Sequence, residues 1–479
     1  MKNTLLAACV GISAFAVAQP QPLFRPVDIH YDTRTVIIPE GFKYSVLYSE
    51  YDTVVTNAGT RAPGKGSQDM IVYIPIDSSS EHGYLYVNQE EHIPNKLLGD
   101  GGGGTVFEVR KKRGQWVVVG DKHAVDFSNV GETFRNCGGT ITPRGTILTT
   151  EEEFPQSNAE IYTRFGITDT SDYRGKKKYL NYGWMVEVDP KTHKAIQKVK
   201  EFGRYPHEDA QCMPDGKTIY LTSDNVPAIV FKYICKEPGV YTGGQLYAYQ
   251  QSADAQSGSW IALPMQEDSL MNIIDVAVRR HATMLNSTEW IEAIGDKLYI
   301  SESGTNHFSF DREIAMGGHP AHHLDQLCHT TDHNYEDHYG RIVELDLRTN
   351  KMRPYLNGGV SKVNSRFCFS SPDAMTSATI RGKKYLIISE DTDGDKNGSA
   401  SAEVSAKHQV YNEVYFLDMS IPNPTLEDLK RFMVGPEGCE TSGNMFTPDG
   451  RNYFVSIQHP TTSNPPPFNK TAVIAITGF

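Results

Sequence analysis

A short pattern that recurs six times constrains the fold of this chain more than any other feature. In each copy a polar or acidic residue precedes a strand, a tight turn follows, and a second strand rich in Tyr, Ile and Leu ends in a polar residue. The clearest copy is FRNCGGTITPRGTILTTEEEF, residues 134–154, in which Pro143-Arg144-Gly145 supplies the turn. Because a hairpin brings its entry and exit to one edge, each copy predicts a small group of polar side chains there.

The other copies fill most of the remaining sequence. They open at Asp69, His207-Glu208, Glu289, Asp373 and Glu440, and their second strands read GYLYVNQEE, KTIYLTSDN, KLYISESG, KKYLIISEDTDG and RNYFVSIQHP. A repeat of roughly 60 to 85 residues has room for about four strands, which is the size of a propeller blade. We therefore expect an all-β fold: a six-bladed β-propeller over residues 61–479 with loop insertions, preceded by an extended, proline-rich arm over residues 19–60 that could close the ring.

The polar ends of these hairpins combine a thiol with carboxylates. Cys137 opens the hairpin that Glu151-Glu152-Glu153 close, and a thiolate beside several carboxylates is unfavourable unless a cation lies between them. Carboxylate oxygens suit calcium, whereas a thiolate among oxygens suits iron or zinc. A disulfide or a buried thiol is the alternative for Cys137, and strand-end acids are often only solvated. Six hairpins with the same arrangement favour a metal centre in a shared mouth.

The N-terminus and the charge balance limit the location and the partners. Residues 1–18, MKNTLLAACVGISAFAVA, have the pattern of a cleaved secretory signal, which is favoured over a lipoprotein box at Cys9. No other apolar run is long enough to span a bilayer, so we expect a secreted or periplasmic protein without membrane insertion. The net charge of -12, with only short clusters such as Lys176-Lys177-Lys178, argues against nucleic acid as a partner.

Several other segments admit two interpretations each. The run Gly101–Gly104 could cradle phosphate, but no helix pattern with Lys-Ser/Thr follows it, so a flexible loop is favoured. Residues 303–340 are predicted to be a blade insertion whose histidines could bind zinc, although their spacing matches no compact ligand motif and solvated histidines are commoner. These histidines surround Cys328 and are His307, His319, His322, His323, His329, His333 and His338. The six cysteines outside the signal could also form disulfides of undetermined pairing.

Five motifs resemble those of the PhoX-type alkaline phosphatases, which are secreted six-bladed propellers. They are NCGGTITPRGTILTTEEEF, GRYPHEDA, TEWIEA, FSSPDAM and FMVGPEGCETSGNMFTPDGRNYFVSIQHP. The resemblance implies a phosphomonoesterase with a compound iron and calcium centre, in which Cys137 stands where the family places its iron-ligating cysteine. The other ligands that the resemblance implies are Glu90, Glu151, Glu152, Glu208, Asp224, Glu289, Asp373, Asp391 and Glu440. Glu208 and His207 are in addition candidates for proton delivery or for tuning the ligands.

One departure from the family bears on the substrate. The family commonly has Arg-Pro-Glu-Trp at its fourth hairpin, with an arginine that holds phosphate, whereas this chain has Ser287-Thr288-Glu289-Trp290. A serine cannot replace a planar, permanently charged guanidinium. Arg135, Arg144 or Arg280 could supply the charge from elsewhere.

We therefore expect a small phosphorylated substrate and a monomeric enzyme, since a closed ring has little need of a partner. Two alternatives stay open on the sequence. One is another propeller hydrolase, a phosphodiesterase or a lactonase, which the missing arginine suggests. The other is a non-catalytic binding propeller stabilised by calcium, which the acidic mouth alone would allow.

Overall fold

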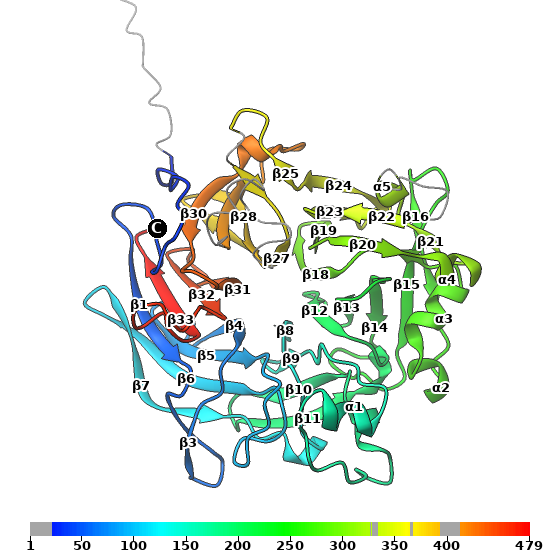
Figure 1. Cartoon of the computed structure of the whole chain (residues 1–479), viewed down its shortest axis with the longest axis horizontal. Coiled ribbons are helices and arrows are strands. Elements are labelled where there is room, and N and C mark those ends of the chain that lie inside the picture. Colours follow the sequence, from blue (N-terminus) through cyan, green and yellow to red (C-terminus); the bar gives the residue numbers. More distant parts are fainter. Residues whose placement is uncertain (1–21, 326, 328–333, 365–366, 393–411) are drawn as a thin grey trace, which may run out of the picture.

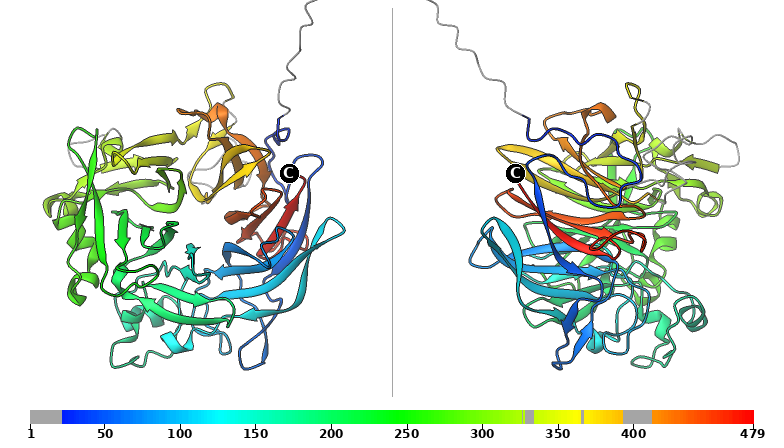
Figure 2. Two further views of the ribbon diagram at one scale, coloured as in Figure 1. Left: turned by 180° about the vertical axis from the view of Figure 1, so that it is seen from behind. Right: turned by 60° about the vertical axis from the view of Figure 1, so that its left-hand side comes forward.

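Six sheets, antiparallel apart from one parallel pair of strands in the first blade, surround a central axis, which confirms the six-bladed β-propeller (Figure 1). Figure 2 shows the same ring from behind and from the side. The structure is a computed structural model, and it describes residues 22–325, 327, 334–364, 367–392 and 412–479. The predicted signal at residues 1–18, together with Cys328, His329 and His333, lies outside the described residues.

The first three blades follow one another in chain order. Their strands run in chain order from the axis outward, except that the two outermost strands of blade 1 precede its other strands in the sequence. Blade 1 contains β4 (Gln68–Pro75), β5 (His82–Gln89), β6 (Gly104–Lys112), β7 (Gln115–Ala124), β2 (Thr53–Val55) and β3 (Arg61–Pro63). Blade 2 contains β8 (Gly139–Ile141), β9 (Ile147–Thr149), β10 (Met185–Asp189) and β11 (Lys194–Val199). Blade 3 contains β12 (His207–Cys212), β13 (Thr218–Ser223), β14 (Phe231–Ile234), β15 (Gln245–Gln251) and β16 (Gly258–Ala262).

The last three blades follow the same plan. Blade 4 contains β18 (Thr288–Ile294), β19 (Lys297–Glu302), β23 (Arg341–Asp346) and β24 (Lys351–Asn357). Blade 5 contains β27 (Pro372–Ile380), β28 (Lys383–Glu390), β29 (Glu413–Asp418) and β30 (Lys430–Val434). Blade 6 contains β31 (Glu440–Phe446), β32 (Asn452–Gln458), β33 (Ala472–Thr477) and β1 (Lys43–Ser49).

The N-terminal segment contributes to the closure of the ring. Strand β1 pairs antiparallel with β33 and is the outermost strand of blade 6, so that one sheet joins both ends of the chain. Upstream of β1, the ring of Phe24 packs against Phe416 and Phe432 with centroids 5.2 and 5.1 Å apart. The boundaries at residues 18 and 60 stay predictions.

Helices and short strands occupy the connections between the blade strands. The helices are α1 (Asn158–Thr163), α2 (Glu267–Leu270), α3 (Ile273–Arg279), α4 (Asp311–Ala315) and α5 (His322–Asp325), with 3-10 turns η1 (Ser128–Val130), η2 (Lys178–Asn181), η3 (Lys200–Phe202) and η4 (Leu426–Asp428). The short strands are β17 (Thr283–Met284), β20 (Thr305–Ser309), β21 (His319–Pro320), β22 (Asn334–Asp337), β25 (Gly359–Val360) and β26 (Cys368–Phe369). Elements β20 to β22 lie between β19 and β23, so the histidine-rich segment is an insertion in blade 4.

The hydrophobic core lies between the faces of neighbouring blades. Leu148 of blade 2, Leu221 of blade 3 and Ile300 of blade 4 are fully buried members of one cluster. The second strand of each blade is covered on both faces, which explains its enrichment in Tyr, Ile, Leu and Val. This packing fixes six inner strands, β4, β8, β12, β18, β27 and β31, around one axis (Figure 1).

Candidate metal centre

Bulges at the start of four inner strands aim one side chain of each of these blades toward the axis. The pairing register shifts between Gln68 and Ile71 in β4, and the corresponding shift recurs in β12, β18 and β27. Such a bulge changes the direction of the side chain that directly follows the first paired residue of the strand. The residues at this inner position are Asp69, Glu208, Glu289 and Asp373, and Cys137 takes the same place just before β8.

A second position, which we call the rim position, directly follows the second strand of a blade. Its residues are Glu90, Asp224, Ser303 and Asp391, together with Glu152 in blade 2. In four blades the amide of this residue donates to the carbonyl of the residue two places before the inner position. These hydrogen bonds are Glu90 to Ser67 (2.8 Å), Glu152 to Arg135 (3.1 Å), Ser303 to Ser287 (3.1 Å) and Asp391 to Ser371 (3.0 Å). Each hairpin thus places its inner and rim side chains next to each other.

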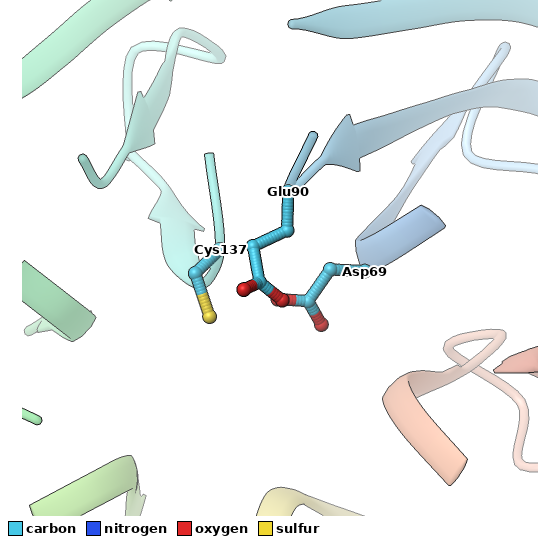
Figure 3. A group of neighbouring side chains, drawn as sticks. All are labelled: Asp69, Glu90 and Cys137. Atoms are coloured by element: carbon cyan, nitrogen blue, oxygen red, sulfur yellow. The ribbon is translucent and has the colours of Figure 1, made fainter. Parts of the chain in front are cut away.

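The inner and rim residues converge into one connected set of potential ligands. Four groups of three have ligand atoms within 4.8 Å of one another: Asp69, Glu90 and Cys137; Glu90, Glu440 and His459; Cys137, Glu152 and Glu208; and Glu208, Glu289 and Asp373. Figure 3 shows the first group, in which the Cys137 sulfur and the two carboxylates face a common space. Because the groups share members, they form one cluster around the axis, which is the mouth.

Burial and mutual repulsion work against negative charge in this cluster. Burial, followed by the charges of Asp69 and Glu208, raises the pKa of the Cys137 thiol well above its usual value. Burial, followed by the charges of Glu289 and Glu152, does the same to the pKa of Glu208. The Cys137 thiol donates to Glu208 Oε1 over 2.8 Å. Bound cations would offset the negative charge that burial disfavours in this cluster.

The donor set fits a cluster of several cations. No Lys or Arg of the described chain lies within 4.0 Å of the carboxylates of Asp69, Glu208 or Asp373. Gln458 Nε2 donates to Glu90 and Glu440 over 2.8 and 2.9 Å, while its buried Oε1 has no hydrogen-bond partner. Carboxylate and amide oxygens are ligands for calcium, and the Cys137 sulfur is a ligand for iron or zinc.

Arg135 is a basic side chain that reaches two other carboxylates of the mouth, those of Glu90 and Glu152. Its guanidinium pairs with Glu90 and lies 2.9 Å from Glu152. The other two arginines that the sequence suggests lie elsewhere. Arg144 sits in the turn between β8 and β9 and pairs with Glu187 at 2.5 Å, and Arg280 caps α3 as an exposed residue.

Glu151 differs from the other predicted ligands. Its carboxylate is fully buried, lies 2.8 Å from Lys198 Nζ, and also accepts from Thr133 and from the amide of Trp184. It belongs to none of the ligand groups of the described chain. Glu152, one residue later, faces the mouth because successive side chains of an extended strand point to opposite sides. The geometry therefore gives no support to Glu151 as a metal ligand.

His207 is packed beside the mouth rather than in it. Its ring is fully buried, stacks on Tyr205 with centroids 3.6 Å apart, and hydrogen-bonds Gly203 O through Nε2 at 2.9 Å. Burial lowers the pKa of His207 to about 3, so the ring is neutral near neutral pH. The geometry does not support the prediction that His207 delivers a proton to the substrate.

Two other predicted site residues lie at the edge of the cluster. Asp224 is a rim residue, and burial, followed by the charge of Glu152, raises its pKa to about 6. Asp391 is the rim residue of blade 5, and its charge contributes to the raised pKa of Glu289 and of Glu440. Neither belongs to the four groups of ligand atoms, so their role as metal ligands stays a prediction.

Sequence reasoning left Asp69 and His459 out of the ligand set. Asp69 opens the first hairpin as Cys137 opens the second, so its place in the repeat could have identified it. His459 follows Gln458 at the end of the last hairpin and joins the group of Glu90 and Glu440. Its position depends on a left-handed backbone, φ 52°, which the sequence does not indicate.

The loop that contains Gly101–Gly104 supports the mouth through hydrogen bonds of its backbone. Its backbone carbonyls at Asp100, Gly101 and Gly102 accept hydrogen bonds from the buried Lys65 ammonium over 2.8, 3.0 and 2.6 Å. The amide of Gly103 donates to Asn136 Oδ1 over 2.8 Å, beside Cys137. The loop is therefore held in place by a lysine and supports the segment that carries the thiol.

The described histidines of the insertion and the described cysteines give no second metal group. His323 pairs with Glu302, His319 contacts Thr283, and His307 lies near Glu336. The five described cysteines, Cys137, Cys212, Cys235, Cys368 and Cys439, are all free. The disulfide interpretation therefore has no support within the described residues.

Comparison with known families decides the relationship. The sequence matches the family model described as alkaline phosphatase PhoX over residues 23–461. The chain belongs to the alkaline phosphatase PhoX family. It is therefore a phosphatase, as the resemblance in the sequence implied. A search of curated protein sequences gave no significant match.

Solved structures support the fold of this PhoX family member. The chain is similar to Pseudomonas fluorescens PhoX in complex with vanadate, a transition state analogue, with 20% identity, a TM-score of 0.72, and coverage of 95% of this chain and 98% of that one. It also matches a Trichoderma reesei carbohydrate-active enzyme of family AA12 with a TM-score of 0.43 and 8% identity, over 95% of this chain and 99% of that one. The first similarity establishes the propeller fold.

Proposed function

We propose that this phosphatase is an exported enzyme that hydrolyses phosphomonoesters at a cluster of iron and calcium ions in the propeller mouth. One observation carries the proposal: buried carboxylates and a thiol, supplied by all six blades, share a space with little positive charge of their own. Cys137 and its neighbours Glu152 and Glu208 would hold iron, and groups made of carboxylates would hold calcium.

The residues of the mouth would prepare the substrate for hydrolysis. Bound cations would polarise the phosphate group and stabilise the oxygen of the departing alcohol. The protein supplies the frame: the bulges aim Asp69, Glu208 and Asp373 at one space, and Gln458 orients Glu90 and Glu440. Glu208 accepts a hydrogen bond from the Cys137 thiol, so its carboxylate is placed to hold or release a proton beside that thiol.

Export is part of the proposal. Residues 1–18 carry the signal pattern, and no described helix is long and apolar enough to cross a membrane. A signal of this kind is removed during export. Edman or mass-spectrometric analysis of the N-terminus of protein recovered outside the cytoplasm should show that the chain begins at residue 19, and a retained Met1 would contradict export by this route.

Metal analysis and a substrate panel test the activity together. The purified protein should contain iron and calcium, and it should release phosphate from p-nitrophenyl phosphate under alkaline conditions. Vanadate, which Pseudomonas fluorescens PhoX binds as a transition state analogue, should inhibit. Absence of turnover with both metals present would refute the proposal.

The same panel separates the alternatives. Faster hydrolysis of phosphodiesters or lactones than of monoesters would assign a different hydrolase. No turnover on any substrate, together with stabilisation by calcium, would assign a binding propeller. Oligomeric state stays a prediction, and light scattering should give the mass of a monomer.

A further inference from the structure

The position that lacks the family's arginine has an equivalent in another blade. Ser287 stands two residues before Glu289, and Arg135 stands two residues before Cys137. Both have left-handed backbone, with φ 45° and 42°. Ser67 and Ser371 take the same place before Asp69 and Asp373, with φ 49° and 46°. Such values are uncommon for residues other than glycine, so their recurrence marks one position of the repeat.

The backbone hydrogen bonds establish the same equivalence independently. The carbonyl of Arg135 accepts from the rim residue Glu152 over 3.1 Å, and the carbonyl of Ser287 accepts from the rim residue Ser303 over 3.1 Å. Arg135 and Ser287 therefore occupy corresponding positions in two blades around one axis. An arginine in blade 2 can approach the mouth as an arginine in blade 4 would.

The side chain of Arg135 has the properties that phosphate recognition requires. It is 26% exposed at the mouth, where it pairs with Glu90 and Glu152. A guanidinium stays positively charged at any working pH. A planar guanidinium donates two parallel hydrogen bonds to phosphate oxygens.

We propose that Arg135 is the arginine that binds the phosphate group of the substrate, in place of a residue at Ser287. This inference rests on the proposed phosphatase activity of the mouth. Cations held by Glu90 and Glu152 would occupy the carboxylate oxygens that pair with Arg135. The N–H donors of the guanidinium would then be available to the phosphate group of the substrate. Ser287 lies near Asp224.

An exchange between the two positions tests the inference. Arg135→Asn tolerates the left-handed backbone but removes the charge, and Arg135→Lys keeps the charge without the fork. The double variant Arg135→Asn/Ser287→Arg returns an arginine to the equivalent position of blade 4. The control is Arg144→Asn, which removes an arginine from the far turn of the same hairpin.

Two readouts are measured for each metal-loaded variant: the Kd for inorganic phosphate by equilibrium dialysis, and KM and kcat on p-nitrophenyl phosphate. Arg135→Asn should raise Kd and KM by roughly 10- to 100-fold with unchanged iron and calcium, Arg135→Lys should give an intermediate value, and the control should match wild type. The exchange variant should recover most of the loss.

The failures are distinguishable. Wild type that releases no phosphate refutes the proposed function before the arginine is tested. If wild type is active, an unchanged Kd in Arg135→Asn overturns the inference. A fall in metal content with no specific change in Kd also overturns it, because Arg135 would then only position the ligands.

Discussion

Two buried clusters of carboxylates lie close together in this propeller and have opposite electrostatics. In the mouth, burial and neighbouring acids raise the pKa of Glu208 well above its usual value. In the interior of blade 4, Glu302 is equally buried, and burial alone would raise its pKa. Its contacts with His323 and Arg341, at 2.7 and 3.0 Å, instead lower the pKa of Glu302 to about 2.

The difference between the clusters lies in the source of positive charge. Arg341 lies between Glu302 and Asp337, at 3.0 and 2.7 Å, so in the blade 4 cluster the protein itself supplies positive charge. The mouth gathers more carboxylates than Arg135 can neutralise. A buried charge without a partner is costly, which supports the proposal that the mouth binds cations. We expect the first cluster to stabilise the fold and the second to serve binding.

The largest expected effect is the loss of iron from Cys137→Ser. A neutral hydroxyl is a poor ligand compared with a thiolate, so iron should fall to background. Inductively coupled plasma analysis of the purified protein measures this. The matched control is Cys235→Ser, which alters a buried thiol of blade 3 outside the ligand groups and should keep the iron. Wild-type iron content in Cys137→Ser would show that Cys137 is not an iron ligand, and the contrast between the two clusters would lose its main support.

A pair of neighbouring glutamates gives the next largest effect. Glu152→Gln should lower the affinity for the metals by about 10- to 100-fold, and with it their occupancy, without unfolding the protein. Glu151→Gln should keep the metals but lower the free energy of unfolding by about 3 to 5 kcal/mol, because Lys198 is left buried without its partner. Metal analysis and urea unfolding separate the two. Equal metal loss in both variants would show that Glu151 is a ligand after all.

This pair also shows what the sequence could and could not predict. The six hairpins, the propeller and the meeting of Cys137 with Glu208 follow from the repeat, because hairpin geometry brings strand ends together. The choice between Glu151 and Glu152 does not follow, since one residue of register reverses the direction of a side chain. Only the contacts in the folded structure decide it, above all that of Glu151 with Lys198.

Two further differences between expectation and structure have the same origin. His207 is adjacent to Glu208 in the sequence, yet its ring is packed on Tyr205 because neighbours on a strand face opposite sides. His459 reaches the mouth only through a left-handed backbone. Composition and spacing identify a repeat position, whereas local backbone conformation decides which side chain at that position is used.

A smaller effect is expected in the cluster that needs no metal. The pKa of Glu302 is depressed from 4.5 to about 2, so its ionised form stabilises the fold above pH 4.5, and this is lost as the pH falls toward 2. The difference corresponds to about 3 kcal/mol of the free energy of unfolding. Glu302→Gln should lose about that much at pH 7, as measured by urea unfolding, and should keep its iron and calcium.

The pH series provides the control for Glu302. Wild type should lose stability relative to Glu302→Gln between pH 4.5 and 2, whereas Asp296→Asn, in an exposed turn of the same blade, should follow wild type. A metal deficit in Glu302→Gln would show that the two clusters are one functional unit, and the contrast between them would fail.

The smallest effect separates the clusters by their response to calcium. Binding to the folded state alone stabilises by about 2.7 kcal/mol at a free calcium concentration 100 times Kd. The thermal unfolding midpoint should therefore rise with calcium after chelation with EGTA. The rise should be the same in Glu302→Gln as in wild type, because Glu302 already pairs with Arg341. It should be smaller in Glu440→Gln, which removes a carboxylate from the mouth. An equal rise in Glu440→Gln would place the stabilising calcium outside the mouth, and the mouth would then need another source of positive charge.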